Sequence, residues 1–306
     1  MILFDMLFNF KLILGILMVG FTSIVAAKPA PNKLVPIGNP IYVASEVPSE
    51  VTFLFNPDSK LILKHAKDTS FTTFLGAINR GPKKNKKIAL VLTGDEFADG
   101  GDKIYQTLKE KNVKASFFLT GRFYKNPTFK SIITKLHKAG HYMGAHSDQH
   151  LLYNDWTKRD SLLVDYPTFK KDLLDNYVAM QAFGIKSSDA PYYLPPYEWY
   201  NQTIADWTKG LNFTLVNFTA GTRSTADYTY PEMGKSYRGS AEIYQSIFDY
   251  ESKDPYGLNG FILLIHIGTD PRRPDKFYDH LPQLIDDLQA KGYSLVKLNE
   301  LLNTNN

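Results

Sequence analysis

The sequence predicts an α/β fold, a distorted (β/α)7 barrel with an N-terminal extension or small β-rich segment. From Lys87 onward, apolar runs of strand length alternate with helical segments, which is typical of a parallel sheet. These runs are apolar throughout, as expected for strands that are buried on both faces. About seven strand–helix units can be counted, one fewer than in a regular eight-unit barrel.

The expected elements follow one another regularly over residues 87–302. The clearest strand is the continuous apolar run at 88–93, which a Gly/Asp loop follows. Further strands are expected at 113–119, 141–145, 190–194, 211–217, 261–266 and 293–296. Helices are expected at 103–110, 128–139, 168–182, 199–209, 240–249 and 280–291. Upstream, residues 41–80 carry only a weak β pattern, which is clearest at 51–55.

Residues 1–27 have the pattern of an export signal peptide. Residues 12–27 form a mostly apolar run behind Lys11, and the run closes on the small residues of Val-Ala-Ala. It is short for a membrane span, although residues 2–10 are also apolar and leave an uncleaved anchor as the alternative. We expect cleavage after Ala27, a periplasmic or extracellular protein, and no stable membrane span in the mature chain. Residues 28–86 then form an extension or accessory segment, and residues 87–302 form the barrel.

The composition of the chain indicates which classes of binding partner to expect. Hydrophobic residues make up 43% of the 306 residues and charged residues 22%, which is ordinary for a globular protein. A formal net charge of +4 does not indicate a nucleic-acid partner. The chain has no cysteine, so its stability depends on its core without disulfides. Aromatic residues reach 14%, which suits either an aromatic core or a surface that stacks on sugars.

Polar residues follow three of the expected strands, where the chemistry of such barrels lies. Asp95 and Glu96 end the first strand, His146 and His150 follow the third, and His266 closes the sixth. On a helical turn, two histidines four residues apart share one face and can bind one ion. Two histidines and one carboxylate leave a fourth zinc position open for water.

Each of these residues alone also has a simpler explanation. An Asp-Glu pair after a strand is common at a helix N-terminus, where the dipole favours it. The two histidines suit a polar surface, and His266, flanked by leucine and isoleucine, suits a hydrogen-bonded core position. Their joint placement at three strand ends favours a catalytic site.

Together, these residues resemble the motifs of polysaccharide deacetylases with NodB homology, carbohydrate esterase family 4, in a divergent branch. The resemblance covers residues 87–302. The family's Thr-Phe-Asp-Asp is similar to residues 93–96 (Thr-Gly-Asp-Glu), and its Arg-x-Pro-Tyr to residues 194–197 (Leu-Pro-Pro-Tyr). Its His-Ser/Thr-x-x-His is matched in full at 146–150, and its Leu-x-His at 264–266.

The resemblance implies a role for each polar residue. Glu96, His146 and His150 would hold a divalent metal, with Zn²⁺ the expected ion. Bound metal lowers the pKa of water enough to supply hydroxide at neutral pH. Asp95 would be the general base, and His266 the general acid that protonates the leaving group.

The resemblance also implies which residues meet the substrate. The backbone N–H of Tyr197 would stabilise the developing oxyanion. Pro196, Trp199 and Leu264 would form walls for the acetyl methyl group and the sugar ring. The expected function is therefore that of an exported metal-dependent hydrolase, which removes acetyl groups from an N- or O-acetylated oligo- or polysaccharide.

Three departures from the family pattern affect the surroundings of the site. Glu96 replaces an aspartate, and Leu194 replaces the arginine that orients the base. The fourth motif, Asp-x-x-Asp-Trp, is missing where residues 216–223 stand. Arg223, Asn217 and Asp270 are candidates to replace the lost partners. Such outer partners typically affect activity or metal affinity 10–100-fold.

These departures leave two alternatives open. One is a carbohydrate-binding pseudoenzyme that keeps the barrel for recognition. The other is a hydrolase of a non-sugar C–N bond, because a fold and a metal site do not fix the substrate.

Overall fold

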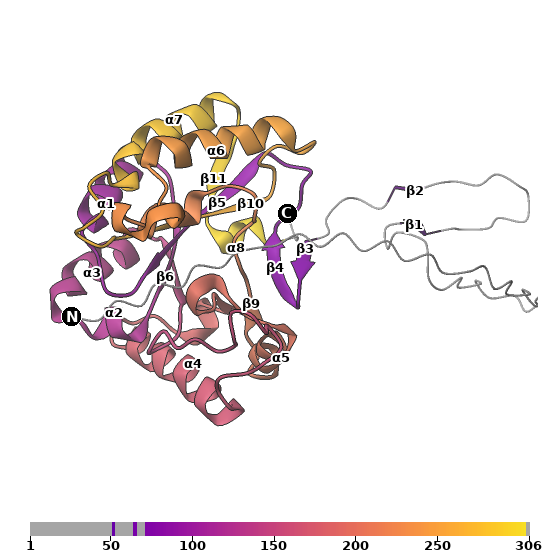
Figure 1. Ribbon diagram of the computed structural model, residues 1–306, viewed down its shortest axis with the longest axis vertical. Helices are drawn as coiled ribbons and strands as arrows, with labels where there is room; N and C mark the ends of the chain where they lie inside the picture. Colours follow the sequence, from indigo (N-terminus) through magenta and orange to yellow (C-terminus); the bar gives the residue numbers. More distant parts are fainter. Residues whose placement is uncertain (1–50, 53–63, 66–70, 304–306) are drawn as a thin grey trace, which may run out of the picture.

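The chain forms a curled, open, mixed β-sheet surrounded by helices (Figure 1), which confirms the expected distorted barrel. The computed structural model describes residues 51–52, 64–65 and 71–303. The expected signal peptide at 1–27 lies outside the described residues, as does most of the expected extension. A short pair, β1 (Val51–Thr52) with β2 (Lys64–His65), stands apart from the main sheet.

The main sheet has nine strands. Eight follow the spatial order β3-β4-β10-β5-β6-β7-β8-β9, and β11 pairs with the first part of β5. Their bounds are β3 (Thr72–Phe74), β4 (Ala77–Arg80), β5 (Lys87–Gly94), β6 (Ser116–Leu119), β7 (Tyr142–Ala145), β8 (Tyr192–Tyr193), β9 (Thr214–Leu215), β10 (Phe261–His266) and β11 (Ser294–Val296).

The helices cover the outside of the curled sheet (Figure 1). The α-helices are α1 (Gly101–Glu110), α2 (Gly121–Lys125), α3 (Lys130–Lys138), α4 (Tyr166–Gln181), α5 (Gln202–Gly210), α6 (Ser240–Lys253), α7 (Leu281–Ala290) and α8 (Leu298–Leu301). Short 3-10 helices are η1 (Pro127–Phe129), η2 (Ser187–Asp189), η3 (Pro196–Glu198), η4 (Ser224–Tyr228), η5 (Pro231–Ser236) and η6 (Phe277–His280).

Local sequence explains why these segments form strands and helices. Residues 88–92 of β5 are fully buried, because β10 and β6 flank this strand and helices cover it. In α4, Phe169, Leu173, Tyr177 and Met180 recur every three or four residues and are buried on one face. The Asp165 side chain caps this helix by accepting a hydrogen bond from the Thr168 amide at 2.9 Å.

A hairpin of β3 and β4 belongs to the main sheet, although sequence placed these residues in the extension. β4 runs antiparallel to β10, and a parallel bridge between Ile78 and Val216 links the two ends of the curled sheet. Arg80, 4% exposed, fixes the hairpin by an ion pair of 3.1 Å with Asp254. The hairpin at residues 72–80 is therefore part of the barrel wall.

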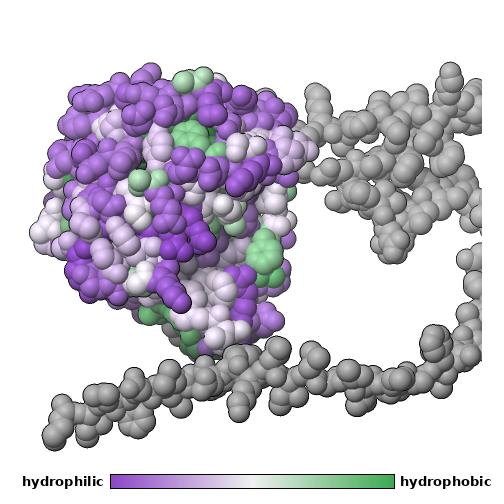
Figure 2. Space-filling model, turned by 45° about the horizontal axis from the view of Figure 1, so that its top comes forward, coloured by the Kyte–Doolittle hydropathy of each residue, from purple (hydrophilic) through white to green (hydrophobic). Residues whose placement is uncertain are grey.

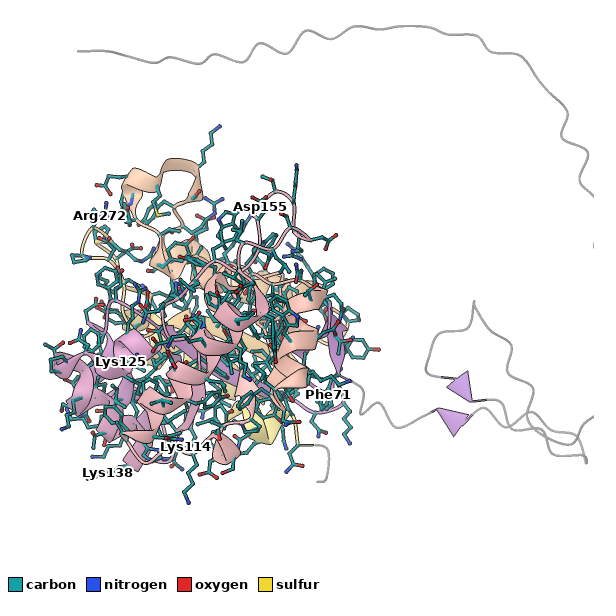
Figure 3. All side chains as sticks on the ribbon, turned by 90° about the horizontal axis from the view of Figure 1, so that it is seen from below. Phe71, Lys114, Lys125, Lys138, Asp155 and Arg272 are labelled. Carbon is teal, nitrogen blue, oxygen red and sulfur yellow. The ribbon has the colours of Figure 1, made fainter. Side chains whose placement is uncertain are left out.

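Parallel register brings the carboxyl ends of four strands to one edge. His266 of β10 lies opposite Thr93 of β5, Gly94 lies opposite Leu119 of β6, and Leu119 lies opposite Ala145 of β7. The residues that directly follow these positions therefore meet at one end of the molecule. Figure 3 shows Asp155 and Arg272 at this end and Lys114 and Lys138 at the opposite end.

The surface seen in Figure 2 is mostly hydrophilic, and its apolar residues form a few separate groups. Within the part of the chain that the structure describes, every helix is too short or too polar to cross a membrane.

Candidate functional site

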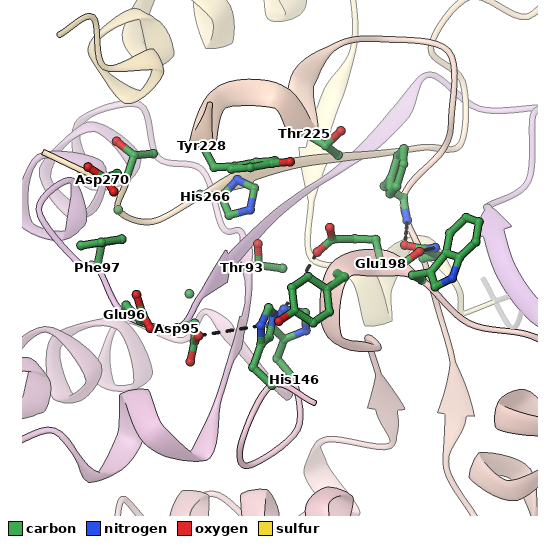
Figure 4. Close-up of a pocket in the computed structure, with 18 of the residues that line it drawn as sticks. Thr93, Asp95, Glu96, Phe97, His146, Glu198, Thr225, Tyr228, His266 and Asp270 are labelled. Atoms are coloured by element: carbon green, nitrogen blue, oxygen red, sulfur yellow. Dashed lines mark hydrogen bonds and ion pairs between the residues drawn. The ribbon is translucent and has the colours of Figure 1, made fainter. Parts of the chain in front are cut away.

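A cleft of about 850 Å³ opens at the carboxyl ends of the strands (Figure 4). Its walls come from the segments after β5, β7, β8, β9 and β10, as parallel register requires. Of the catalytic, metal and substrate residues expected from the sequence, seven line this cleft: Asp95, Glu96, His146, His150, Tyr197, Trp199 and His266. The candidate substitutes Asn217 and Asp270 line it as well.

His146 and His150 approach each other without a helix. Sequence placed the pair on a helical turn, but residues 146–150 form a loop in which Ser147 and His150 have φ of 70° and 54°. The Ser147 hydroxyl accepts a hydrogen bond from the His150 amide at 2.9 Å and closes this turn. The two ring centroids are still 5.0 Å apart. The left-handed backbone of this loop therefore brings the two imidazoles together, as a helical turn would have done.

Side chains of helix α4 fix this loop by hydrogen bonds. The Asn176 side chain accepts a hydrogen bond from the His146 amide at 2.7 Å and donates one to the Leu119 carbonyl at 3.2 Å. The Asp172 side chain accepts a hydrogen bond from the Gln149 amide at 2.7 Å. The histidine loop thus has buried polar supports, which sequence reasoning did not identify.

Burial keeps both imidazoles neutral. Desolvation lowers the pKa of His146 to about 4 and that of His150 to about 2. The Nδ1 atom of His146 lies 2.9 Å from the Leu194 carbonyl oxygen, and in this pairing Nδ1 carries the proton. Its Nε2 is then an unprotonated donor atom at the cleft, the form that binds metals.

Asp95 is oriented by α2 and by Thr120, the N-cap of that helix. Arg122 donates from Nε to Asp95 Oδ1 at 3.1 Å and from Nη2 to Oδ2, and the Thr120 hydroxyl donates to Oδ1 at 2.8 Å. Leu194, where the family has its arginine, is fully buried. Arg122 therefore supplies the bidentate contact that Leu194 cannot make. Its signal in the sequence is a charged residue three positions after the end of the strand β6.

His266 is paired with a buried aspartate. Asp227 Oδ1 lies 2.6 Å from His266 Nδ1, and Asp227 Oδ2 accepts a hydrogen bond from the His266 amide at 2.8 Å. Burial alone would lower the pKa of His266, but the charges of Asp227 and Glu198 outweigh it, and the pKa lies above its usual value. The ring therefore tends to hold its proton near neutral pH.

The aspartate expected from the fourth motif is thus present at a different position. Asp227 and Tyr228, in η4, correspond to the Asp-Trp end of that motif and lie just beyond residues 216–223. Tyr228 packs edge-on against His266 with centroids 5.4 Å apart. A Tyr in place of Trp and a shift along the chain hid the match.

None of the three expected substitutes takes these roles within the described residues. Asp270 pairs with Arg272, and the Asn217 amide donates to the Glu198 carbonyl at 2.8 Å. Arg223 is exposed, and its backbone amide donates to Ser246. Arg122 and Asp227 occupy the two positions instead.

Glu96 lies at the cleft wall with its side chain exposed. Figure 4 shows it on the far side of Asp95 from His146. It makes no hydrogen bond or ion pair to any residue that the structure describes. The carboxylates that face the histidines are those of Asp95, whose Oδ2 is 3.8 Å from His150 Nδ1, and Glu198.

Glu198 was not singled out from sequence. Its Oε1 lies 3.9 Å from His146 Nε2, and its side chain is 14% exposed. Desolvation raises the pKa of this carboxyl to about 7, with the charge of His266 opposing the rise. No sequence pattern marks Glu198 as a site residue, because its side chain reaches the cleft only through the fold of the loop after β8.

Aromatic side chains form one wall of the cleft. Trp156 and Tyr197 are 53% and 44% exposed, and Trp199 lies 5.4 Å from Trp156 between ring centroids. The Arg159 guanidinium lies 3.5 Å from the centroid of Trp199. Tyr197 also covers His150, with centroids 4.3 Å apart. This wall offers apolar ring faces next to the polar centre.

Two residues expected to meet the substrate lie elsewhere. Pro196 and Leu264 are buried in the core and do not line the cleft. Leu264 is an interior residue of β10, where side chains alternate about the strand, so it packs away from the mouth.

The donor set suits a divalent metal ion, although its members do not yet converge. Among the residues that the structure describes, no three His, Cys, Asp or Glu side chains surround one point closely enough to hold an ion as they stand. Two neutral imidazoles beside carboxylates are nevertheless the ligands that zinc prefers. The Glu198 carboxylate is largely buried and accepts no hydrogen bond from the residues that the structure describes, which is further evidence that a cation fits here.

In comparisons with known proteins, this chain matches one family model and is similar to two deacetylases. Residues 82–216 match the family model of polysaccharide deacetylase. The chain is 25% identical over 221 residues to a bifunctional xylanase/deacetylase of Pseudobutyrivibrio xylanivorans, covering 71% of this chain and 31% of that protein. It is 26% identical over 236 residues to a peptidoglycan-N-acetylglucosamine deacetylase of Bacillus cereus, covering 73% and 71%. The chain thus spans less than a third of the first relative's length.

Solved structures share the fold. Bacillus subtilis PdaA, a family 4 carbohydrate esterase, superposes with a TM-score of 0.57 at 22% identity, over 74% of this chain and 85% of that one. A family 4 pseudoenzyme from Bacillus anthracis also gives 0.57, at 18% identity over 74% and 69%. At this level of identity the likeness establishes the fold.

Proposed function

Because the chain carries a polysaccharide deacetylase domain of carbohydrate esterase family 4, we propose that it is a metal-dependent hydrolase that removes acetyl groups from an N- or O-acetylated carbohydrate. The observation that carries this proposal is the restored surroundings of the acid and the base. Arg122 orients Asp95 although Leu194 stands in place of the expected arginine, and Asp227 orients His266 as the aspartate of the fourth motif would. A chain that had lost catalysis would need neither of these two contacts.

The residues of the cleft can perform each step of acetyl hydrolysis. Asp95, fixed by Arg122, accepts the proton of the attacking water, whose oxygen bonds to the acetyl carbonyl carbon. The carbonyl oxygen takes the negative charge and lies near the backbone N–H of Tyr197. When the C–N or C–O bond breaks, His266 gives its proton to the amine or alkoxide, and acetate is the second product.

Protonation of His266 before the reaction follows from its surroundings. Asp227 and Glu198 raise its pKa, so the ring carries the proton that the leaving group needs. His146 and His150, together with a carboxylate at the cleft, would hold the divalent metal, with Zn²⁺ favoured by the donors. When bound, such an ion polarises the acetyl carbonyl and lowers the pKa of water.

The aromatic wall supports a carbohydrate as the substrate. Trp156, Tyr197 and Trp199 present ring faces at the cleft, and sugar C–H faces pack against such rings. The hydroxyl groups of a sugar also suit the polar residues at the centre. An acetylated oligo- or polysaccharide is therefore the substrate class that we propose.

Acetate release tests the proposed activity. The purified protein would be incubated with acetylated chitooligosaccharides, peptidoglycan fragments and acetylxylan, with and without a chelator. We expect acetate from at least one substrate, loss of activity with the chelator, and recovery with added Zn²⁺. Absence of acetate from all three with metal bound would contradict the proposal.

A carbohydrate-binding pseudoenzyme is the second candidate. Leu194 in place of the expected arginine favours it, and one of the structural relatives is itself a pseudoenzyme. Sugar binding that Asp95→Asn leaves unchanged, with no turnover by the unmodified protein, would support this candidate over the enzyme.

We also propose that the protein is exported to the periplasm or the cell exterior, because residues 1–27 have the pattern of a signal peptide. Mass spectrometry of the exported protein should give an N-terminus at Lys28. An intact Met1 terminus would contradict cleavage after Ala27.

A further inference from the structure

Glu198 has a carboxylate that lacks a partner of its own. The side chain is 14% exposed, and no hydrogen-bond donor among the described residues contacts its oxygens. The group that it approaches is His146, with Oε1 3.9 Å from Nε2. A carboxylate removed from water without donors is costly unless a cation compensates it. The charge of His266 acts on this carboxylate, but the ion pair of His266 is with Asp227. Its position therefore points to a positively charged occupant beside His146.

The backbone directs this side chain into the cleft. Tyr197 and Glu198 both have left-handed conformations, with φ of 58° and 53°. Such conformations are unfavourable for side chains with a Cβ and tend to occur at functional sites. The Asn217 side chain fixes the turn by donating to the Glu198 carbonyl at 2.8 Å, and the Glu198 amide donates to Pro195 at 3.1 Å. The turn is thus held by contacts on both sides of Glu198.

The other two carboxylates of the cleft are less suited to bind an ion. Both oxygens of Asp95 accept hydrogen bonds from Arg122, and Oδ1 also accepts one from Thr120. Glu96 is exposed and lies beyond Asp95 from the histidines. By contrast, the Glu198 oxygens accept no hydrogen bond within the described part of the chain, and Oε1 lies 3.9 Å from the unprotonated Nε2 of His146.

We propose that Glu198, in place of Glu96, is the carboxylate ligand of the divalent metal that His146 and His150 bind. The proposal rests on the proposed function for the presence of a metal and assigns a ligand that comes from the loop after β8. Asp95 then does not bind the metal and can accept the proton of water, and Glu96 stays at the rim of the cleft.

Metal binding by matched charge-neutral variants tests this assignment. Zn²⁺ affinity of the full chain would be measured by competition with a chromophoric chelator, and the visible absorption of bound Co²⁺ would report its ligands. Glu198→Gln should weaken Zn²⁺ binding at least about tenfold and alter the Co²⁺ spectrum, since even partners outside the ligand shell affect affinity 10–100-fold. Glu96→Gln removes the same charge and should leave affinity and spectrum unchanged.

Thermal unfolding without metal controls for folding. Glu198→Gln should unfold at the same or a higher temperature than the unmodified protein, while the stabilisation by added Zn²⁺ decreases. Should this variant not fold, Glu198→Gly relaxes the left-handed backbone and serves the same test. His146→Asn should abolish binding of both metals.

Three results would overturn the assignment: unchanged Zn²⁺ affinity in Glu198→Gln, loss of affinity in Glu96→Gln, or no Zn²⁺ or Co²⁺ binding by the unmodified protein. Acetate release has no part in this test. If the protein binds zinc through Glu198 but deacetylates none of the three substrates, the proposed function fails and the ligand assignment stands.

Discussion

At the scale of single residues, two side chains from unexpected positions complete the surroundings of the acid and the base. Arg122 contacts Asp95 through two guanidinium nitrogens, and Asp227 contacts both the ring and the amide of His266. Both contacts are charge-assisted, and both fix a side chain as well as its charge. They lead to two predictions about catalysis.

Arg122→Ala should lower kcat/KM for deacetylation by about 10–100-fold, because Asp95 loses the contact that orients it. Arg122→Lys should recover only part of this loss, since an ammonium group cannot make the bidentate contact. Steady-state acetate release measures both. The exposed Arg223→Ala is the matched control and should be unaffected; equal activity in Arg122→Ala and Arg223→Ala would rule out the role of Arg122.

Asp227→Asn should move the alkaline limb of the pH profile of kcat/KM to lower pH. Asp227 raises the pKa of His266, and an acid catalyst is active only below its own pKa. Removing the negative charge lowers this pKa, so activity is lost at a lower pH. Asp189→Asn, an exposed substitution with the same change of charge, should leave the profile in place. An unchanged limb in Asp227→Asn would show that His266 does not act as the acid.

At the scale of elements, buried polar side chains join strands and helices that sequence reasoning treated separately. Asn176 of α4 links β6 to the histidine loop. His141, 6% exposed, precedes β7 and accepts a hydrogen bond from the Ala115 amide at 3.1 Å, just before β6. It also packs edge-on against Phe117. His141 thus fixes the starts of two neighbouring strands, and it does so as a neutral ring.

The neutral state of His141 makes stability depend on pH. Desolvation, aided by Lys114 and Lys297, lowers the pKa of His141 to about 4 in the folded protein. The unfolded chain therefore binds more protons between the two pKa values, and stability falls as pH drops from about 6.5 toward 4. This group contributes on the order of 3 kcal/mol to that fall.

His141→Asn keeps a hydrogen-bond acceptor and removes the titration. The free energy of unfolding, measured by urea denaturation between about pH 7 and pH 4, should decrease less in this variant than in the unmodified protein. Identical pH slopes for the two proteins would contradict the buried neutral state of His141.

At the scale of the whole molecule, closure of the curled sheet depends on residues before the expected barrel. The β3–β4 hairpin joins β10 on one side and reaches Val216 on the other through Ile78. Arg80 anchors the hairpin to the chain after α6 through Asp254, Gly257 and Asn259. A truncation at Lys87, which the sequence pattern suggests as the start of the domain, would remove this part of the wall.

Arg80→Ala should reduce the free energy of unfolding by about 3 kcal/mol or more, because it leaves Asp254 without its buried partner. For a domain of this size the Tm should fall by roughly 6–12 °C. Calorimetry measures the change, and Lys84→Ala, an exposed substitution in the following turn, is the control. A Tm equal to that of the control would show that the hairpin contributes little to the sheet.

The sequence by itself determined the order of the elements and the core of the site. Apolar runs that alternate with helical segments predicted the strands near their observed positions, because burial on both faces leaves a strong local pattern. Parallel strands end at one edge, so the residues after them, Asp95, His146, His150 and His266, were expected together. The structure brings all four to one cleft.

Only the tertiary structure decided which side chains surround that core. Arg122 is 27 residues from Asp95 along the chain, and Asp227 is 39 residues from His266. Contacts over such separations depend on how loops fold back, and no local periodicity encodes them. The same holds for Glu198, which a left-handed turn points toward His146, and for Glu96, which the loop after β5 leaves at the rim. Residue types and strand order predict where the catalytic site lies. The backbone conformation of the loops determines which carboxylate faces the histidines in that site.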